Sequence, residues 1–214
     1  MTKQEFFTTL GNLGVAESNR RIKAGSKFVL PSVCIGQSAL ETGYGDSSLM
    51  TKANAFFGIK AGGSWSGKVF TAGTWEVADG VEYNTTANFR AYDSLADSVA
   101  DYYDLIINAS RYANGLSTYP DRIKSANDTI SAIWSGGYAT DELYVSKVMS
   151  IINSNNLTEF DKLVDGKTFD PDYTWAGGTS SGGTSGSIIE GADGTVITGH
   201  KIAYAFKKIQ RIDL

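Results

Sequence analysis

The sequence predicts an α+β fold that is mainly helical, with a small β-hairpin lobe set into a helical body. Apolar residues recur at helical spacing through most of residues 1–163, whereas residues 56–92 are rich in Gly, Thr, Trp and Val and show little helical period. Within that stretch, Asp79-Gly80 separates two short segments of strand character, which is a strong hairpin signal. Because clefts form where two lobes meet, we expect a binding groove between the body and the hairpin.

The helix with the clearest boundaries covers residues 31–41. Pro31 suits the first position of a helix, because its missing N–H would have no partner there, and Gly43 suits the residue after a helix end. Capping residues and apolar stripes predict the remaining helices: one after the capping box Thr2–Glu5, one after the cap Ser94–Asp97, one over 121–134, and one that starts at Thr140 or Asp141.

Composition excludes several classes of function. The chain has 214 residues and a net charge of −4, which argues against a strongly basic nucleic-acid binder. Its apolar runs are shorter than the roughly 20 residues that a membrane-spanning helix needs. One cysteine, Cys34, and one histidine, His200, cannot form a Cys/His zinc site, so we expect neither a metal nor a cofactor. The chemistry of the main body must then come from carboxylates, hydroxyls, Lys and Tyr.

Composition also divides the chain into three parts. Residues 1–163 form the predicted globular domain, and residues 164–187 form a linker rich in Gly, Ser and Thr. Residues 188–214 are too few for a core of their own, so this C-terminal segment is either the start of a second module or a tail packed on something else. Its basic residues favour contact with a partner or a wall: Lys201, Lys207, Lys208 and Arg211.

Glu41 is the first candidate for chemistry. It lies at the C-terminal end of the mainly apolar helix predicted over 31–41. The helix dipole and apolar surroundings both disfavour a negative charge there, so both raise the pKa of the carboxyl. A carboxylic acid that stays protonated near neutral pH is what general acid catalysis requires. A glutamate near a helix end is also commonly a solvated surface residue, so this position alone does not decide its role.

Four stretches of the sequence resemble glycoside hydrolase family 73, the endo-β-N-acetylglucosaminidases that cleave peptidoglycan. The resemblance covers residues 3–163, and both the order and the spacing of the stretches fit the family. The stretches are Pro31-Ser-Val-Cys-Ile-Gly-Gln-Ser-Ala-Leu-Glu-Thr-Gly-Tyr-Gly45, Asn54-Ala-Phe-Phe-Gly-Ile-Lys60, Ala87-Asn-Phe-Arg-Ala-Tyr-Asp-Ser94 and Gly137-Tyr-Ala-Thr-Asp-Glu-Leu-Tyr-Val-Ser-Lys147.

The resemblance implies a lysozyme-like fold in which Glu41 is the general acid that protonates the glycosidic oxygen. It implies that Tyr138 orients the N-acetyl group or stabilises developing charge, although a core tyrosine would look the same in the sequence. Glu76 matches the second glutamate of the family, on the hairpin lobe. Glu82 and Asp79 are alternatives, and the 2-acetamido group of the substrate can also supply this second function.

Aromatic residues beside the predicted groove are candidates for sugar binding, because the apolar faces of pyranose rings stack on aromatic side chains. We expect Tyr44 and Trp75 to contact the glycan, with Trp65 beside them and Phe57 at the base of the groove, where a core role is the alternative.

The sequence therefore predicts a hydrolase that cuts the β-1,4 bond between N-acetylglucosamine and N-acetylmuramic acid in bacterial peptidoglycan strands. An N-acetylmuramidase or lytic transglycosylase on a similar fold is one alternative, and a non-catalytic glycan-binding or virion module is the other. The N-terminal residues show no secretory signal pattern. We thus expect a phage lysin, released through a holin or carried on a virion, or a secreted autolysin whose signal has been removed, acting at the cell wall.

Overall fold

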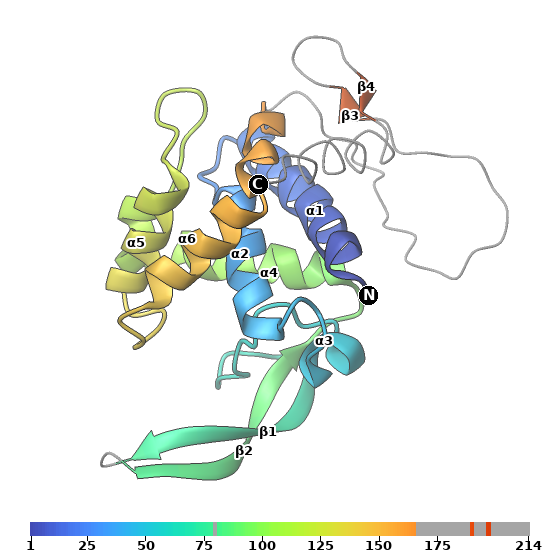
Figure 1. The fold of residues 1–214 in the computed structure, drawn as a ribbon, viewed down its shortest axis with the longest axis vertical. Helices are drawn as coiled ribbons and strands as arrows, with labels where there is room; N and C mark the ends of the chain where they lie inside the picture. Colours follow the sequence, from blue (N-terminus) through green and yellow to red (C-terminus); the bar gives the residue numbers. More distant parts are fainter. Residues whose placement is uncertain (79–80, 166–188, 191–195, 198–214) are drawn as a thin grey trace, which may run out of the picture.

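The computed structural model describes residues 1–78, 81–165, 189–190 and 196–197; residues 74–78 and 81–84 and the last two pairs are described by their backbone. A helical body carries one long antiparallel hairpin that projects from it (Figure 1), which confirms the mainly helical α+β fold. The elements in chain order are α1 (Lys3–Lys23), α2 (Pro31–Thr42), α3 (Ser48–Ala53), β1 (Lys68–Ala78), β2 (Val81–Ala91), α4 (Leu95–Asn108), η1 (Ser110–Gly115), α5 (Ala126–Ser135), α6 (Tyr144–Ser154), η2 (Leu157–Glu159), η3 (Asp161–Leu163), β3 (Ile189–Glu190) and β4 (Val196–Ile197).

Most of the predicted linker over 164–187 and most of the C-terminal segment lie outside the described residues. Of the segment, the structure describes β3 and β4, which pair with each other in antiparallel fashion. The last described part of the body is Asp165, whose backbone N–H donates to Asn19 Oδ1 of α1. None of the described helices combines the length and the apolar character that crossing a membrane requires.

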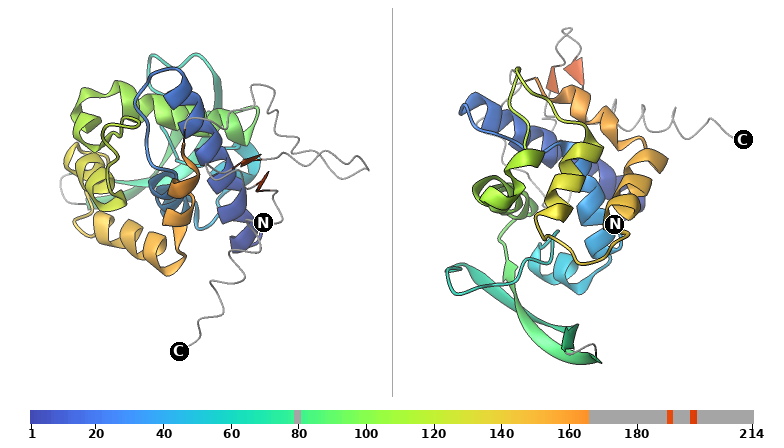
Figure 2. Two further views of the ribbon diagram at one scale, coloured as in Figure 1. Left: turned by 90° about the horizontal axis from the view of Figure 1, so that it is seen from above. Right: turned by 90° about the vertical axis from the view of Figure 1, so that its left-hand side faces the viewer.

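Helix α2 lies in the middle of the body, where α1 and α6 pack against it (Figures 1 and 2). Every residue from Pro31 to Ala39 is buried, so neighbouring elements surround the helix on all sides. Glu41 is the one charged residue among the twelve of this helix. A helix that is apolar almost all round belongs in a core, and its burial fixes the position of everything it carries.

The N-terminus of α2 is capped by a residue from the end of the domain. Its own N-cap, Leu30, makes no side-chain hydrogen bond. Instead, Asp161 Oδ1 accepts from the Ser32 backbone N–H at 2.8 Å and Oδ2 accepts from Ser32 Oγ at 2.6 Å, across 129 residues of sequence. Burial raises the pKa of Asp161 to about 6, although both hydrogen bonds favour its charged form. Segment 157–163 thereby fixes the start of α2.

Two sets of polar contacts attach the hairpin to the body. Where the chain leaves the body, the Phe56 carbonyl accepts from Ser38 Oγ of α2 at 3.1 Å and its N–H donates to Ser98 Oγ of α4 at 3.0 Å. Where the chain returns, Asp101 of α4 accepts from Arg90 Nη1 at 2.8 and 2.9 Å and from the Tyr92 hydroxyl at 2.7 Å. The base of the hairpin is therefore fixed to both α2 and α4.

The predicted hairpin is confirmed and is longer than the sequence indicated. Strands β1 and β2 pair continuously from Lys68↔Ala91 to Ala78↔Val81, and the Asp79-Gly80 pair between them lies outside the described residues. Residues 57–60, which precede the hairpin in the chain, form a single bridge, from Lys60 to Phe89.

Two predicted helix starts are wrong. Helix α5 starts at Ala126 rather than 121, because Thr118 and Arg122 exchange backbone hydrogen bonds in a tight turn and Ser125 then caps the helix through the Asp128 N–H. Helix α6 starts at Tyr144 rather than 140 or 141. The Asp141 carboxylate accepts from the Leu143 N–H and its carbonyl accepts from the N–H of Tyr144, the first residue of the helix, so Asp141 forms a turn before α6.

The aromatic ring of Phe160 lies directly over Gly11 in α1. A Cβ added to Gly11 would come within 2.2 Å of the Phe160 ring, far inside contact distance. A Cβ added to Gly14, one turn later, would come no closer than 3.4 Å to Pro31. The absence of a side chain at Gly11 therefore creates the space into which the end of the domain packs.

We predict that Gly11→Ala lowers the free energy of unfolding by about 1–3 kcal/mol, because overpacking outweighs the better helix propensity of alanine. Gly14→Ala on the same helix is the matched control, and it should leave the free energy of unfolding unchanged or raise it by up to about 1 kcal/mol. Urea denaturation of both variants measures the difference. Equal stability of the two variants would contradict the packing of Phe160 over Gly11.

Candidate active site

Glu41 lies on the last turn of α2, where the helix emerges from the core. Gly43 ends the helix in the left-handed conformation, with φ of 58°, and its N–H donates to the Ala39 carbonyl. Thr42 Oγ1 donates to the Ser38 carbonyl at 2.7 Å and accepts from the Gly45 N–H at 2.9 Å, which fixes the turn that follows. Glu41 itself is exposed, so its carboxyl is accessible to a ligand.

The Glu41 carboxyl has one hydrogen-bond partner among the described residues. The Tyr144 hydroxyl, at the start of α6, donates to Glu41 Oε1 at 3.2 Å. Gln37 Nε2, one turn earlier on α2, in turn donates to the Tyr144 hydroxyl oxygen at 2.9 Å. Tyr144 was not among the residues expected in the site, although it belongs to the motif over 137–147.

The pKa of Glu41 is raised above its ordinary value. The larger cause is desolvation, because surrounding protein displaces water from the carboxyl even though the side chain remains accessible; the hydrogen bond from Tyr144 acts in the opposite direction. The direction agrees with the sequence prediction. A raised pKa increases the fraction of Glu41 that is protonated near neutral pH, which suits proton donation.

Tyr138 lies beside Glu41 and Tyr144, in the turn after α5. Its ring centroid is 5.9 Å from that of Tyr144 and 6.3 Å from that of Tyr112. Desolvation raises the pKa of Tyr138 well above its usual value, and electrostatic interactions with Tyr144 and Glu41 add to this effect. Tyr138 therefore remains a neutral hydroxyl. The structure thus brings together Glu41 and Tyr138, which the sequence analysis selected, and adds Tyr144.

Asp141 organises the loop that carries these tyrosines. Its carbonyl accepts from Trp134 Nε1 at 2.9 Å, and its carboxylate accepts from Lys147 Nζ at 2.6 Å. The hydrogen bond from Lys147 is the main cause that lowers the pKa of Asp141. Asp141 thus joins α5, the loop and α6.

The predicted sugar-binding aromatics are dispersed. The backbone of Tyr44 is in the left-handed region, with φ of 62°. Its ring packs nearly at right angles to the rings of Phe6 and Phe7, and Lys3 Nζ lies 4.5 Å from the ring centroid. The Trp65 ring packs against Tyr92 at the base of the hairpin, with its Nε1 donating to the Lys68 carbonyl.

Phe57 belongs to the core. It is 4% exposed and stacks on Tyr102 with ring centroids 4.0 Å apart. Little of its ring surface is left to contact a sugar. Phe57 therefore has the core role, in which it packs against Tyr102 of α4.

The side chains of Trp75, Glu76 and Glu82 lie outside the part of the chain that the structure describes, as does Asp79 entirely. The backbone register nevertheless places these positions. Glu76 pairs with Tyr83 and Val77 pairs with Glu82. Directly paired residues share a face of a hairpin and neighbours along a strand alternate, so positions 76 and 82 occupy opposite faces, and position 75 shares the face of 82.

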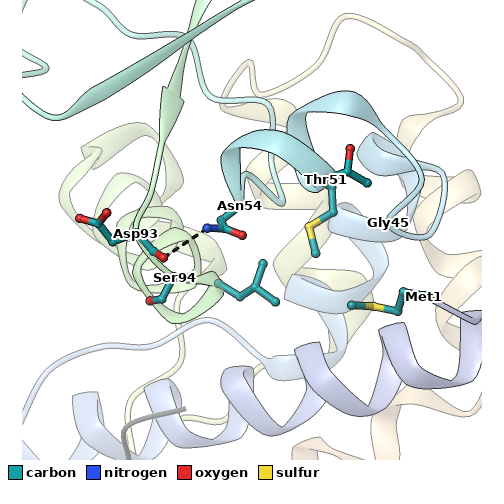
Figure 3. Close-up of a pocket in the computed structure, with 8 residues that line it drawn as sticks. Met1, Gly45, Thr51, Asn54, Asp93 and Ser94 are labelled. Carbon is teal, nitrogen blue, oxygen red and sulfur yellow. Dashed lines mark hydrogen bonds between the residues drawn. The ribbon is translucent and has the colours of Figure 1, made fainter. Parts of the chain in front are cut away.

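A pocket of about 460 Å³ lies near the turn after α2, between α3, the start of α4 and the N-terminus (Figure 3). Its lining includes Asn54, whose Nδ2 donates to the Asp93 carbonyl at 3.3 Å. None of Glu41, Tyr138 and Tyr144 belongs to this lining. Among the described residues, no three His, Cys, Asp or Glu side chains are grouped to hold a metal ion.

Solved structures similar to this one define the class of protein. The catalytic domain of the autolysin Auto from Listeria monocytogenes matches with a TM-score of 0.62 and 33% identity, over 75% of this chain and 88% of that domain. A C-terminally truncated glycoside hydrolase domain of FlgJ from Salmonella typhimurium matches with a TM-score of 0.57 and 27% identity, over 72% of this chain and 98% of that domain. The fold thus places the chain in the class of glycoside hydrolases with a lysozyme-like fold.

The sequence comparisons name the family. The family model for glucosaminidases, described as mannosyl-glycoprotein endo-beta-N-acetylglucosaminidase, matches residues 21–157. The chain belongs to this glucosaminidase family, glycoside hydrolase family 73. The exo-glucosaminidase LytG of Bacillus subtilis is 33% identical over 137 residues, which are 63% of this chain and 47% of LytG. The autolysin of Enterococcus faecalis is 31% identical over 171 residues, which are 78% of this chain and 22% of that protein. The chain thus spans less than half the length of these relatives.

We predict that Glu41 titrates above the ordinary value of about 4.5 for a glutamate. A carboxyl whose pKa rises on folding binds more protons in the folded state, so its contribution to stability falls as pH rises between the unfolded and folded values. Carbon-13 NMR of the glutamate carboxyls, with Glu41→Gln to assign the signal, measures the pKa directly. A Glu41 signal at or below the ordinary value would contradict the assignment.

Proposed function

We propose that this protein hydrolyses the β-1,4 bond between N-acetylglucosamine and N-acetylmuramic acid in bacterial peptidoglycan, with Glu41 as the general acid. The observation that carries the proposal is an exposed glutamate with a raised pKa at the open end of a buried helix, hydrogen-bonded to the hydroxyl of Tyr144, whose ring packs against Tyr138. The names of the relatives support the substrate, since they include peptidoglycan hydrolases and an autolysin.

In this mechanism Glu41 transfers its proton to the glycosidic oxygen as the bond from that oxygen to the anomeric carbon breaks. The sugar that keeps the anomeric carbon develops oxocarbenium character. Water finally adds to that carbon and gives one proton to the second carboxylate or back to Glu41. Tyr138 orients the N-acetyl group or stabilises the developing charge. Its neutral hydroxyl, and the packing of its ring against Tyr144, the hydrogen-bond partner of Glu41, support this role.

Glu76 is our choice for the second carboxylate, and the hairpin register supports it over Glu82. The face that contains position 76 continues to the Phe70↔Phe89 pair. Phe89 is buried and Phe70 packs against the cluster of Ala53, Ala55 and Tyr92, so this face turns toward the body at its base. The other face carries Val69, which is 50% exposed. Trp75 shares this second face, which leaves Glu76 and Trp75 on different sides of the hairpin.

The decisive experiment for the proposed function is product analysis. Purified peptidoglycan is digested, the new reducing ends are reduced with borohydride, and the terminal sugar alcohols are identified by mass spectrometry. We expect glucosaminitol ends. Muramitol or anhydromuramic ends would mean an N-acetylmuramidase or a lytic transglycosylase, and wall binding without new ends would mean a non-catalytic module.

In the same assay we predict that Glu41→Gln lowers the rate by at least about 100-fold, the usual scale for loss of an acid catalyst. Glu159→Gln, which changes an exposed glutamate paired with Lys162, is the matched control and should retain activity. Near-normal release of reducing ends by Glu41→Gln would rule out Glu41 as the acid.

The register gives a separate prediction for the hairpin. Because positions 76 and 82 lie on opposite faces, Glu76→Gln should lower the rate substantially, by less than Glu41→Gln does, while Glu82→Gln stays near the wild-type rate. Initial rates on purified peptidoglycan measure both variants. The opposite ranking would assign the role to Glu82, and no loss in either variant would assign it to the acetamido group of the substrate.

We further propose that the protein acts at the bacterial cell wall. A phage lysin released through a holin or carried on a virion, and a secreted autolysin, both remain predictions for its origin. The relatives include an autolysin and FlgJ proteins named as peptidoglycan hydrolases.

A further inference from the structure

A chain of hydrogen bonds runs from the core to the candidate acid. The Tyr102 hydroxyl of α4 donates to Gln37 Oε1, Gln37 Nε2 donates to the Tyr144 hydroxyl oxygen at 2.9 Å, and the Tyr144 hydroxyl donates to Glu41 Oε1 at 3.2 Å. Gln37 and Tyr102 are fully buried, and Tyr144 is 4% exposed. Three elements, α2, α4 and α6, each contribute to this chain.

The chemistry of the amide gives the chain one direction. An amide nitrogen can only donate, so the Tyr144 oxygen must accept from Gln37 and its single proton is left for Glu41. The reverse orientation of the amide would remove the acceptor that Gln37 Oε1 provides for the buried Tyr102 proton, and a buried unsatisfied donor is costly. Tyr102 therefore fixes Gln37, and Gln37 fixes the direction in which Tyr144 donates.

We propose that Tyr144 is a positioning residue that holds Oε1 of Glu41 in a hydrogen bond within the protein. Oε2 is then the oxygen that carries the acid proton and faces the glycosidic oxygen. Gln37 and Tyr102 act through Tyr144. In the protonated carboxyl, Oε1 is the carbonyl oxygen that accepts from Tyr144, and Oε2–H is free to donate to the substrate. This inference rests on the proposed role of Glu41 as the acid.

The same hydrogen bond acts after the proton has left. The proton of Oε2 moves to the glycosidic oxygen, and the negative charge that appears on Glu41 is then stabilised by the Tyr144 hydroxyl. Burial, and after it the charge of Glu41, raise the pKa of Tyr144 far above neutral pH. Tyr144 therefore remains a donor at every pH at which the enzyme is expected to work.

Tyr103 provides a matched comparison for Tyr144, because it is also a buried tyrosine whose hydroxyl is hydrogen-bonded. It donates to the Gly14 carbonyl at 3.1 Å and lies 2.9 Å from Ser18 Oγ, which connects α4 to α1. No hydrogen bond connects Tyr103 to Glu41 among the residues the structure describes. Loss of the Tyr103 hydroxyl should therefore affect stability without affecting the acid.

Tyr144→Phe tests the proposal, because it removes the hydroxyl and keeps the ring. Loss of a hydrogen bond that favours charged Glu41 should raise the pKa of Glu41 in carbon-13 NMR and move the alkaline limb of the kcat/KM profile to higher pH. We expect kcat to fall roughly 10-fold or more, with a smaller change in KM, as loss of a hydrogen bond to a charged group predicts.

Gln37→Met tests the rest of the chain, because methionine is of similar length and cannot donate. It should change the pKa of Glu41 and kcat in the same direction as Tyr144→Phe, by a smaller amount. Adding Gln37→Met to Tyr144→Phe should cause no further shift in pH profile, because Gln37 acts through the hydroxyl that is already missing. Additive shifts would overturn this order of action.

Tyr103→Phe is the control. It should lose about as much thermal stability as Tyr144→Phe and keep the wild-type pH profile. A Tyr144→Phe variant that keeps the wild-type Glu41 pKa and profile, or behaves like Tyr103→Phe, would overturn the proposal. A different result would contradict the proposed function alone. In that case Glu41→Gln would remain active, although Tyr144→Phe still shifts the NMR signal of Glu41.

Discussion

The burial of α2 is the constraint on which the rest of the structure depends. A helix without exposed positions from Pro31 to Ala39 needs partners for all of its polar groups, because each unsatisfied one costs about 1–3 kcal/mol. Those partners come from every part of the domain: Asp161 binds Ser32, the Phe56 carbonyl binds Ser38, and Tyr102 and Tyr144 bind Gln37. Satisfying the buried helix therefore also fixes the hairpin, the loop before α6 and the end of the domain in relation to Glu41.

The same burial adjusts the chemistry of Glu41. The helix brings a carboxyl to the edge of the core, where it is accessible from one side and poorly solvated from the other. Desolvation favours the protonated acid, and the hydrogen bond from Tyr144 opposes this effect without cancelling it. An acid that must give up its proton and later regain it needs both influences, since desolvation alone would make the resulting carboxylate too unfavourable.

The parts of this arrangement that local chemistry determines could be predicted from the sequence. Pro31 and Gly43 set the bounds of α2 to within a residue, and Asp79-Gly80 located the hairpin. Contacts between distant residues left no local signal: Gln37 and Tyr144 are 107 positions apart. The start predicted for α5 was wrong for a related reason, because the tight turn at Thr118–Arg122 competes with helix formation and an apolar stripe does not reveal it. Tyr144 belongs to the core by burial, and only its hydroxyl joins the site.

The hairpin adds a constraint that the sequence order conceals. Trp75 and Glu76 are neighbours in the chain and were both expected to face the glycan, yet the pairing of β1 with β2 places them on opposite faces. A strand cannot turn two adjacent residues to one groove without a bulge, and the pairing is continuous here. With Glu76 as the second carboxylate, Trp75 would contact the glycan only where the glycan chain passes round the hairpin to its other face. The body and the hairpin therefore differ in what they can contribute: α2 holds Glu41, the proposed acid, from within the core, while the hairpin, fixed to α2 and α4 at its base, can turn the face of position 75 or that of position 76, and not both, toward one groove.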